Sequence, residues 1–117
     1  MSTRLLLVDD DAAFRRLARR ALEAAGHEVV GAAANVEQAL RLARELNPTA
    51  MLVDVNLPDG SGFELTARVT REHPGTAVVL TSTYDRDEFE ALARASGARG
   101  FLPKDELSGP ELRRRLG

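Results

Sequence analysis

The order in which short apolar runs and amphipathic segments alternate is the feature of this sequence that most limits its fold. Apolar runs recur at residues 5–8, 29–33, 50–53, 77–80 and 101–102. They are mostly continuous rather than alternating with polar residues, which is typical of parallel strands covered by helices on both faces. Each run is followed by a segment of helical character, so the sequence predicts the pattern (βα)5.

The helical segments are marked both by the spacing of their apolar residues and by their ends. From Phe14 to Ala25 apolar side chains recur three and four positions apart, as on one face of a helix. Asp11 is expected to cap this first helix, and Gly26 and Gly97 are suited to helix C-termini. Polar pairs with capping-box spacing, or close to it, are Asn35 with Gln38, Ser61 with Glu64, Asp85 with Glu88, and Ser108 with Glu111.

Strands joined through helices form a parallel sheet with right-handed crossovers, so the fold class is α/β, a doubly wound sandwich. The chain has 117 residues, which is enough for one domain with its own core, and we expect residues 1–117 to form a single domain. With 44% hydrophobic and 29% charged residues, the composition is that of a folded protein rather than a disordered one.

Composition also excludes several classes of function. The net charge of −2 provides no strongly basic surface, so we expect no direct binding of nucleic acid. The absence of cysteine excludes disulfides, thiolate catalysis and zinc–thiolate sites. The apolar run near the N-terminus has only four residues, too short for a signal peptide or a membrane span. We therefore expect a cytoplasmic protein that does not bind membranes.

Polar side chains gather at one end of the predicted sheet. In an open parallel sheet, ligands bind outside the carboxyl ends of the strands. Asp9, Asp10 and Asp11 follow the first apolar run, and Asp54 follows the third. Thr81 and Ser82 follow the fourth run, and Lys104 comes after the fifth. Because these strand ends share one edge, several carboxylates, a hydroxyl and an ammonium are expected to form a site.

The chemistry of these groups suits phosphoryl transfer. Crowded carboxylates need a cation, and oxygen ligands favour Mg²⁺ or Mn²⁺, here held by Asp9 and Asp10. A carboxylate such as Asp54 can attack phosphorus and form an acyl phosphate. The metal, a hydroxyl from Thr81 and the ammonium of Lys104 can then stabilise the phosphoryl oxygens.

Each residue also has a simpler interpretation. Taken alone, Asp54 suits a turn, Thr81 a strand and Phe101 the core. Lys104 carries more weight because it is the only lysine among 16 basic residues, and a compact ammonium fits a small phosphoryl group better than a planar guanidinium does. The run at 113–115, three arginines, is interpreted as a solvated helix face or a frayed end.

Four segments together resemble the receiver domain of two-component response regulators: LLLVDDD, LVDVNLPDGSGFEL, VVLTS and GARGFLPK. The resemblance covers essentially the whole chain and implies a flavodoxin-like fold with strand order 2-1-3-4-5. It also implies a role for each site residue. These are Asp54 as phosphoacceptor, Asp9 and Asp10 as the acidic pair with Asp10 a direct metal ligand, the Asn56 carbonyl as a further ligand, Thr81 and Phe101 as switch residues, and Lys104 as the phosphate-binding lysine.

Where the sequence departs from the family pattern, the details point to a subgroup. Asp105 follows Lys104 where many receivers have proline, which resembles receivers of LuxR-type regulators and makes a role in transcription regulation an option. Ser61 stands where many receivers carry aspartate. Phe101 replaces the commoner tyrosine, so a contact of that hydroxyl is not available.

The resemblance implies partners as well. A sensor histidine kinase or a phosphotransfer protein would supply the phosphoryl group. A downstream effector or a fused output domain would be contacted through the fourth helix, fifth strand and fifth helix, although no output domain is expected in this chain. The resemblance also allows a homodimer that forms on phosphorylation. Such a domain catalyses only its own phosphorylation and dephosphorylation and is not a conventional enzyme.

Two alternatives remain open at this point. The first is a receiver-like interaction module that acts without phosphorylation. The second is a phosphatase of the haloacid-dehalogenase type, in which Asp54 and Asn56 would form a DxD-like motif that lacks the second acid. A dinucleotide fold is not supported, because Gly60 and Gly62 are followed by Leu65 where that fingerprint needs glycine or alanine.

Overall fold

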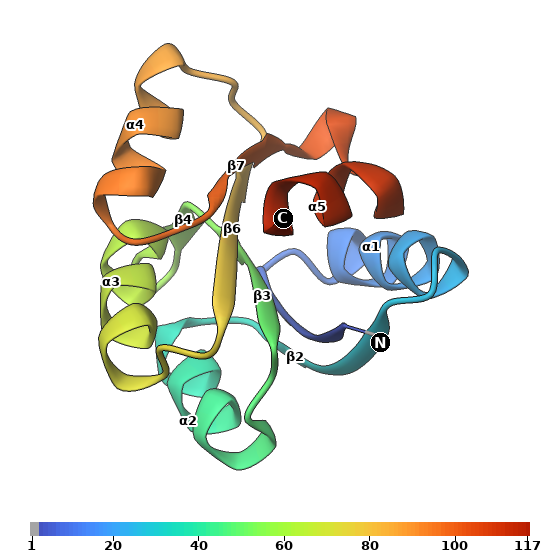
Figure 1. Ribbon diagram of the computed structural model, residues 1–117, viewed down its shortest axis with the longest axis horizontal. Helices are drawn as coiled ribbons and strands as arrows, with labels where there is room; N and C mark the ends of the chain where they lie inside the picture. Colours follow the sequence, from blue (N-terminus) through green and yellow to red (C-terminus); the bar gives the residue numbers. More distant parts are fainter. Residues whose placement is uncertain (1–2) are drawn as a thin grey trace.

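A computed structural model of the chain describes residues 3–117 and alternates strands with helices from end to end (Figure 1). In chain order the elements are β1 (Arg4–Val8), α1 (Ala12–Ala24), β2 (Glu28–Ala33), α2 (Val36–Leu46), β3 (Ala50–Asp54), β4 (Asn56–Leu57), β5 (Gly60–Ser61), α3 (Gly62–Glu72), β6 (Ala77–Ser82), α4 (Asp87–Ala95), β7 (Gly100–Pro103), the 3₁₀ helix η1 (Lys104–Glu106) and α5 (Gly109–Leu116).

The main sheet has five parallel strands in the order β2-β1-β3-β6-β7. Counting only these five strands, this is the predicted order 2-1-3-4-5, so the flavodoxin-like (βα)5 prediction is confirmed. From β1 the chain crosses to β2 on one side, and β3 lies on the other side of β1. The connections therefore leave β1 and β3 in opposite directions, which opens a crevice at their carboxyl ends.

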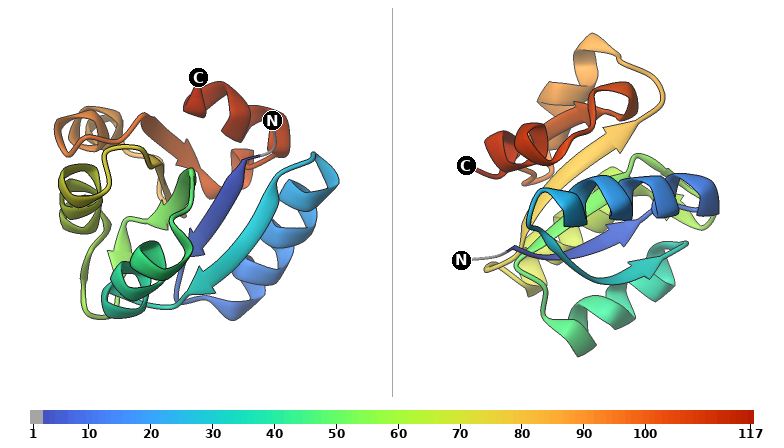
Figure 2. Two further views of the ribbon diagram at one scale, coloured as in Figure 1. Left: turned by 60° about the horizontal axis from the view of Figure 1, so that its bottom comes forward. Right: turned by 90° about the vertical axis from the view of Figure 1, so that its right-hand side faces the viewer.

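Helices cover both faces of the sheet (Figure 2). On one face α1 and α5 pack against a cluster that includes Leu5, Leu7, Leu22 and Leu112. On the other face α2, α3 and α4 pack against a cluster that comprises Leu6, Val8, Ala33, Ala39, Leu40, Ala43, Met51, Val53, Val55, Leu57, Leu65, Val69, Val78, Leu80, Ala93, Ala98 and Phe101. Successive residues of β1 thus enter opposite cores, which explains why its apolar run is continuous. Among residues 3–117, no helix is long and apolar enough to cross a membrane.

Most of the predicted helix ends are confirmed. The Asp11 carboxylate accepts hydrogen bonds from the backbone N–H groups of Ala13 and Phe14 at the start of α1. The side chains that cap α2, α3 and α5 are those of Asn35, Ser61 and Ser108. Gly26 and Gly97 both adopt the positive φ that favours glycine after a helix.

The predicted cap of α4 is wrong. The sequence predicts Asp85 as the cap, paired with Glu88, but α4 begins at Asp87. Arg86 is in the capping position, and its side chain accepts no hydrogen bond from the helix. The first turn of α4 carries acidic residues at 87, 88 and 90, which favour a helix N-terminus through the helix dipole without a cap.

The interpretation of residues 113–115 as a solvated helix face is wrong for Arg115, which is partly buried, whereas Arg113 and Arg114 are exposed. Arg113 donates from Nη2 to the Ala25 carbonyl at 2.8 Å, which ties α5 to the end of α1. Arg115 donates from Nε to the Phe101 carbonyl at 3.2 Å, on the open edge of β7. Arg114 is exposed like Arg113 and pairs with Glu111 one turn away.

The connection from β3 to α3 contains a small hairpin that the sequence patterns do not predict. β4 and β5 pair in antiparallel fashion and turn the chain back, so that the Gly62 N–H donates to the Val55 carbonyl at 2.7 Å. A Cβ at Gly62 would collide with the backbone carbonyl of Asp54, so this close approach requires glycine. The hairpin thereby holds the backbone just after Asp54.

Asp59, at the tip of this hairpin, caps a helix that is distant in sequence. Its carboxylate accepts hydrogen bonds from Val36 N at 2.7 Å and Glu37 N at 3.1 Å, in the first turn of α2. These hydrogen bonds, the one from Val36 above all, lower the pKa of Asp59 below its ordinary value of 3.8. The contact anchors the loop after β3 to the neighbouring helix.

We expect Asp59→Ala to lower the free energy of unfolding at pH 7, because two N–H groups of α2 lose their acceptor. A carboxylate whose pKa is lowered by folding stabilises the fold above its unfolded pKa of 3.8 and loses that effect as the pH falls through the folded value. The loss in free energy of unfolding caused by Asp59→Ala, measured by urea unfolding, should therefore become smaller below pH 3.8. Asp85→Ala is the control, since Asp85 caps no helix, and an equal deficit in both variants would contradict the assignment.

Candidate phosphoryl-transfer site

A hollow at the carboxyl end of the sheet is lined by four of the predicted site residues: Asp10, Asp54, Asn56 and Lys104. Its volume is about 290 Å³, and the residues that line it are Asp10, Asp11, Asp54, Asn56, Ser82, Thr83, Tyr84 and Lys104. Strands β3, β4 and β6, the 3₁₀ helix η1 and the turns after β1 and β6 each contribute at least one of these residues. The crevice of the doubly wound sheet is therefore lined mainly by polar and acidic side chains.

Asp9 follows the last residue of β1 and is 2% exposed. Its backbone N–H donates to the Ala33 carbonyl at 2.9 Å, which continues the pairing of β1 with β2. One carboxylate oxygen, Oδ1, accepts from Asp11 N at 2.9 Å. The other, Oδ2, lies 2.7 Å from the Lys104 ammonium and receives no hydrogen bond from any other group in the described chain. The negative charge of this buried carboxylate is therefore balanced by one cation, the Lys104 ammonium.

Asp54 ends β3, and it too faces Lys104. Its Oδ2 lies 3.4 Å from the Lys104 ammonium, and its Oδ1 accepts from Asn56 N at 3.2 Å. Lys104 reaches both carboxylates because η1 begins at this residue, directly after β7. The lysine side chain is 15% exposed and bridges the two acids across the crevice.

The electrostatics of the three groups are coupled. Burial raises the pKa of Asp54 above its ordinary value of 3.8, and the charge of Asp9 raises it further, although Lys104 and the Asn56 N–H act in the opposite direction. Burial alone would lower the pKa of Lys104, but the two carboxylates outweigh that effect and raise it above 10.5. The ammonium therefore stays charged, while the carboxylate cluster carries an excess of negative charge.

The donor set fits a divalent cation. Asp9, Asp10 and Asp54 each offer a carboxylate oxygen, and these atoms lie within 4.8 Å of one another. Three carboxylates beside one ammonium leave two uncompensated negative charges, which one divalent ion would balance. Oxygen-only ligands in a partly open site are those that Mg²⁺ uses when it retains water. Asn56, two residues after Asp54, is exposed and lines the same hollow.

Thr81 pairs with Asp54 in the register of β3 and β6, and it is almost fully buried. Its hydroxyl donates to the Leu102 carbonyl in β7 at 2.6 Å and not to a carboxylate. The structure therefore places Thr81 beside the site but turns its hydroxyl toward the neighbouring strand. A rotation about its side-chain bond would be needed to bring the hydroxyl into the crevice.

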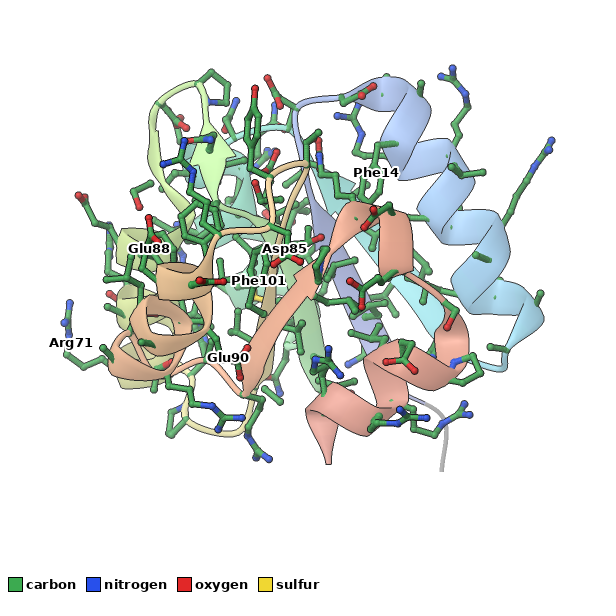
Figure 3. All side chains as sticks on the ribbon, turned by 90° about the horizontal axis from the view of Figure 1, so that it is seen from above. Phe14, Arg71, Asp85, Glu88, Glu90 and Phe101 are labelled. Atoms are coloured by element: carbon green, nitrogen blue, oxygen red, sulfur yellow. The ribbon has the colours of Figure 1, made fainter. Side chains whose placement is uncertain are left out.

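Phe101 lies outside the hollow, on the face of the sheet that α4 covers (Figure 3). It is 4% exposed and packs edge-on against Phe89 of α4 at a centroid distance of 5.3 Å. Its backbone N–H donates to Glu90 of α4 at 3.0 Å, and its carbonyl accepts from Arg115 of α5. The open edge of β7 is therefore closed at Phe101 by side chains from both flanking helices.

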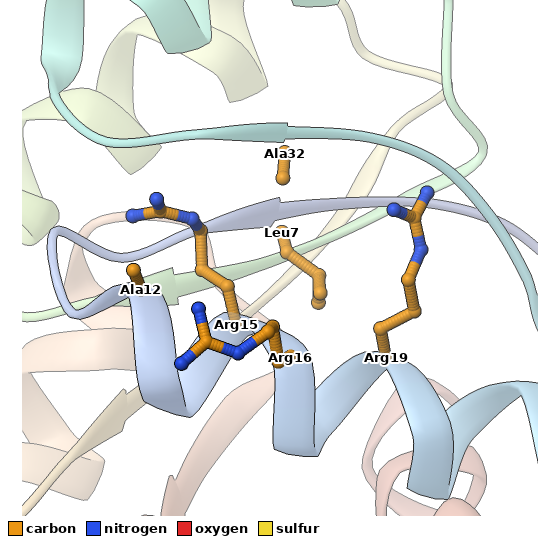
Figure 4. Close-up of a pocket in the computed structure, with 6 residues that line it drawn as sticks. All are labelled: Leu7, Ala12, Arg15, Arg16, Arg19 and Ala32. Atoms are coloured by element: carbon orange, nitrogen blue, oxygen red, sulfur yellow. The ribbon is translucent and has the colours of Figure 1, made fainter.

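A second hollow, of about 170 Å³, lies between α1 and the edge of the sheet (Figure 4). Leu7 and Ala32 belong to its lining, together with Ala12 and the guanidinium-bearing Arg15, Arg16 and Arg19. Of these residues only Arg15 contacts the site, because it donates to the backbone carbonyl of Asp9. Arg15 thus supports the turn that carries the acidic pair.

Comparisons with known proteins point in one direction. The family model for the response regulator receiver domain matches residues 5–116. Response regulator GacA of Pseudomonas protegens is 37% identical over 102 residues, which are 86% of this chain and 48% of that protein. Chemotaxis protein CheY of Thermotoga maritima is 28% identical over 104 residues, which cover 89% of this chain and 87% of CheY. This chain therefore spans about half the length of the GacA relatives it matches.

Solved structures agree with the family model. The signal receiver domain of the response regulator NarL from Mycobacterium tuberculosis superposes with a TM-score of 0.88 at 31% identity. The match covers 99% of this chain and 98% of the NarL chain. The similarity therefore extends to the whole fold, including the strand ends that carry the acidic hollow.

We expect Asp54→Asn to raise the free energy of unfolding at pH 7 in buffer without divalent cations, because it removes a buried negative charge beside Asp9. A carboxyl group whose pKa is raised by folding destabilises the fold above its folded pKa and has no such effect below its unfolded value of 3.8. The gain, measured by urea unfolding, should therefore shrink as the pH falls toward 3.8. Asp105→Asn, an exposed exchange in η1, is the control. A variant less stable than the wild type at pH 7 would contradict this electrostatic account.

Proposed function

The chain belongs to the response regulator receiver domain family, and from this premise we propose that it accepts a phosphoryl group on Asp54 with the help of a divalent cation. The observation that supports the proposal is that the carboxylates of Asp9, Asp10 and Asp54 lie close together, with the Lys104 ammonium paired to Asp9 and Asp54. Receiver domains are signalling modules of two-component systems, so the phosphoryl group is the signal that this domain would receive.

Asp54 is the nucleophile in the proposed reaction. One of its oxygens attacks the phosphorus of a phosphohistidine, the new O–P bond forms, and the P–N bond to the donor imidazole breaks with its electron pair remaining on nitrogen. The backbone N–H of Asn56, 3.2 Å from Asp54 Oδ1, fixes the orientation of the carboxylate. Asp54 is 7% exposed and lines the hollow, which is therefore the side from which a phosphoryl donor would reach it.

The fit of the donor set supports Mg²⁺, or Mn²⁺, as the resident cation. Asp10 and Asp54, with the Asn56 carbonyl, would hold it directly, and Asp9 would lie beside it. When bound, such a cation neutralises negative charge on the incoming phosphoryl oxygens. The turn after β1 holds Asp9 and Asp10 in place for this purpose, because Asp11 N and Arg15 both anchor the Asp9 residue.

Lys104 and Thr81 would bind the phosphoryl oxygens. The ammonium already lies between Asp9 and Asp54, so a short movement from Asp9 would bring it to a group on Asp54. Thr81 would exchange its hydrogen bond with the Leu102 carbonyl for one with a phosphoryl oxygen. That exchange loosens the contact between β6 and β7 and thereby transmits phosphorylation to Phe101 and the helices beside it.

The proposed output surface consists of α4, β7 and α5. Phe101 is already buried in this structure, so the conformational change on phosphorylation would start at Thr81. It would reach α4 and α5 through Glu90 and Arg115, whose side chains form hydrogen bonds with the Phe101 backbone. A sensor histidine kinase or phosphotransfer protein is the proposed donor, and an effector or an attached output domain is the proposed receiver of the change. A phosphorylation-dependent homodimer, transcription regulation and a cytoplasmic location are further proposals that follow from the family.

Hydrolysis would end the signal. Water attacks the phosphorus of the acyl phosphate, the O–P bond to Asp54 breaks, and inorganic phosphate and the free carboxylate are released. The domain thus catalyses its own phosphorylation and dephosphorylation, and each cycle returns it to the starting state. This distinguishes it from a phosphatase that turns over external substrates.

We expect acetyl phosphate with Mg²⁺ to add one phosphoryl group to the wild-type chain and none to Asp54→Asn, because only the carboxylate can attack phosphorus. Intact-protein mass spectrometry measures the label. Asp59→Asn is a suitable control, since that aspartate lies in the same loop but outside the hollow. Equal labelling of the wild type and Asp54→Asn would contradict the assignment of the phosphoacceptor.

Two other outcomes would favour other functions. A wild-type chain that takes up no label, and whose Thr81 and Phe101 resonances do not respond to beryllofluoride and Mg²⁺, would act as an interaction module without phosphorylation. Continuous hydrolysis of a small phosphomonoester would instead indicate a phosphatase of the dehalogenase type.

A further inference from the structure

Lys104 has a third neighbour besides its two carboxylates. Its ammonium lies over the face of the Phe14 ring, 4.4 Å from the ring centroid. Attraction between a cation and an aromatic face is effective within about 6 Å and grows when the pair is withdrawn from water. Lys104 meets both conditions, with a side chain that is 15% exposed. By contrast, Arg86 over Tyr84 is an exposed pair at 6.0 Å, at the limit of the interaction.

The position of Phe14 is set by the same residues that build the site. The Asp9 carboxylate accepts from Asp11 N, and the Asp11 carboxylate in turn accepts from Phe14 N at 3.3 Å. The Phe14 ring lies against the Lys104 ammonium, and that ammonium lies 2.7 Å from Asp9 Oδ2. The contacts form a closed circuit of four residues. Figure 3 shows Phe14 between α1 and the segment after β7, on the far side of that strand from Phe101.

We propose that Phe14 is a positioning residue that holds the Lys104 ammonium over the site and so prepares it to bind phosphoryl oxygens. The proposal rests on the proposed function, because it concerns how the phosphate-binding lysine is held. A lysine side chain has many rotamers, and holding one of them reduces the entropy lost when a ligand binds. The attraction of the aromatic face holds the ammonium on the side of the crevice where Asp9 and Asp54 lie.

A purely structural role would look different. Phe14 is half-buried and also packs against the core cluster of α1 and α5, so its methylene and ring carbons contribute to folding in any case. An aliphatic residue of similar size could supply that packing, but it has no electron-rich face for a cation. The distinction between the two roles therefore lies in ligand binding and not in stability.

The test compares Phe14→Leu with Phe14→Tyr in the full chain. Beryllofluoride, a phosphoryl analogue, is titrated at saturating Mg²⁺, and Mg²⁺ binding alone is measured in parallel. We expect Phe14→Leu to weaken beryllofluoride binding roughly three- to tenfold, as loss of a partly desolvated cation–π contact would. Phe14→Tyr should stay within about twofold of the wild type because tyrosine keeps the aromatic face. Mg²⁺ affinity should be unchanged in both.

Two controls separate this role from general effects of the substitution. Phe63→Leu makes the same exchange at a half-buried ring on the opposite face of the sheet and should leave beryllofluoride affinity unchanged. In a Lys104→Ala background, Phe14→Leu should cause no further loss, because the partner of the ring is gone. An equal loss in that background, or none in the wild-type background, would overturn the proposal.

A second series keeps the proposal testable where leucine at position 14 prevents folding. Phenylalanine carrying one, two or three ring fluorines, inserted only at position 14, preserves size while it withdraws charge from the aromatic face. Beryllofluoride affinity should fall with each added fluorine, and a flat series would contradict the cation–π role. Failure of the proposed function is distinguishable, because in that case the wild-type chain itself would not bind beryllofluoride.

Discussion

A single ammonium group between two buried carboxylates is the interaction on which the functional end of this molecule depends. Asp9 and Asp54 come from neighbouring strands, and Lys104 lies 2.7 Å from one and 3.4 Å from the other. Without that cation, Asp9 would be a buried charge supported by a single hydrogen bond from Asp11 N, which a fold tolerates poorly. Yet the ammonium does not fully balance the acids, and the remaining negative charge suits a divalent ion, which the proposed phosphoryl transfer would use.

The sheet that positions these groups could be predicted from the sequence because its signals are local. Continuous apolar runs, polar residues at strand ends and most of the capping residues are local signals in the chain. They predict the fold and the proximity of Asp9, Asp54 and Lys104 at one end of the sheet. The contacts that escaped prediction join residues far apart. Asp59 caps α2 from 23 positions away in the sequence. The pattern around Phe14 predicts an ordinary core residue of α1, and its contact with Lys104 is evident only in the structure.

On β7 and its flanking helices, too, the sequence predicts the local features but not the contacts between distant residues. The burial of Phe101 is expected from its place in an apolar run, whereas the hydrogen bonds of its backbone with Glu90 and Arg115 are not. Arginine at 115 belongs to a charged run that is typical of a solvent-exposed helix, and only the approach of α5 to the strand edge reveals its role. Thr81 connects the two regions, because its hydroxyl lies at the boundary between the acidic hollow and β7.

The most direct test of this account is a crystal structure of the chain with Mg²⁺ and beryllofluoride. We expect beryllium on an Asp54 oxygen, the Lys104 ammonium on a fluorine while still over the Phe14 ring, and the Thr81 hydroxyl turned away from the Leu102 carbonyl. A structure in which the analogue binds elsewhere, or in which Lys104 remains paired with Asp9 and Thr81 with Leu102, would contradict it.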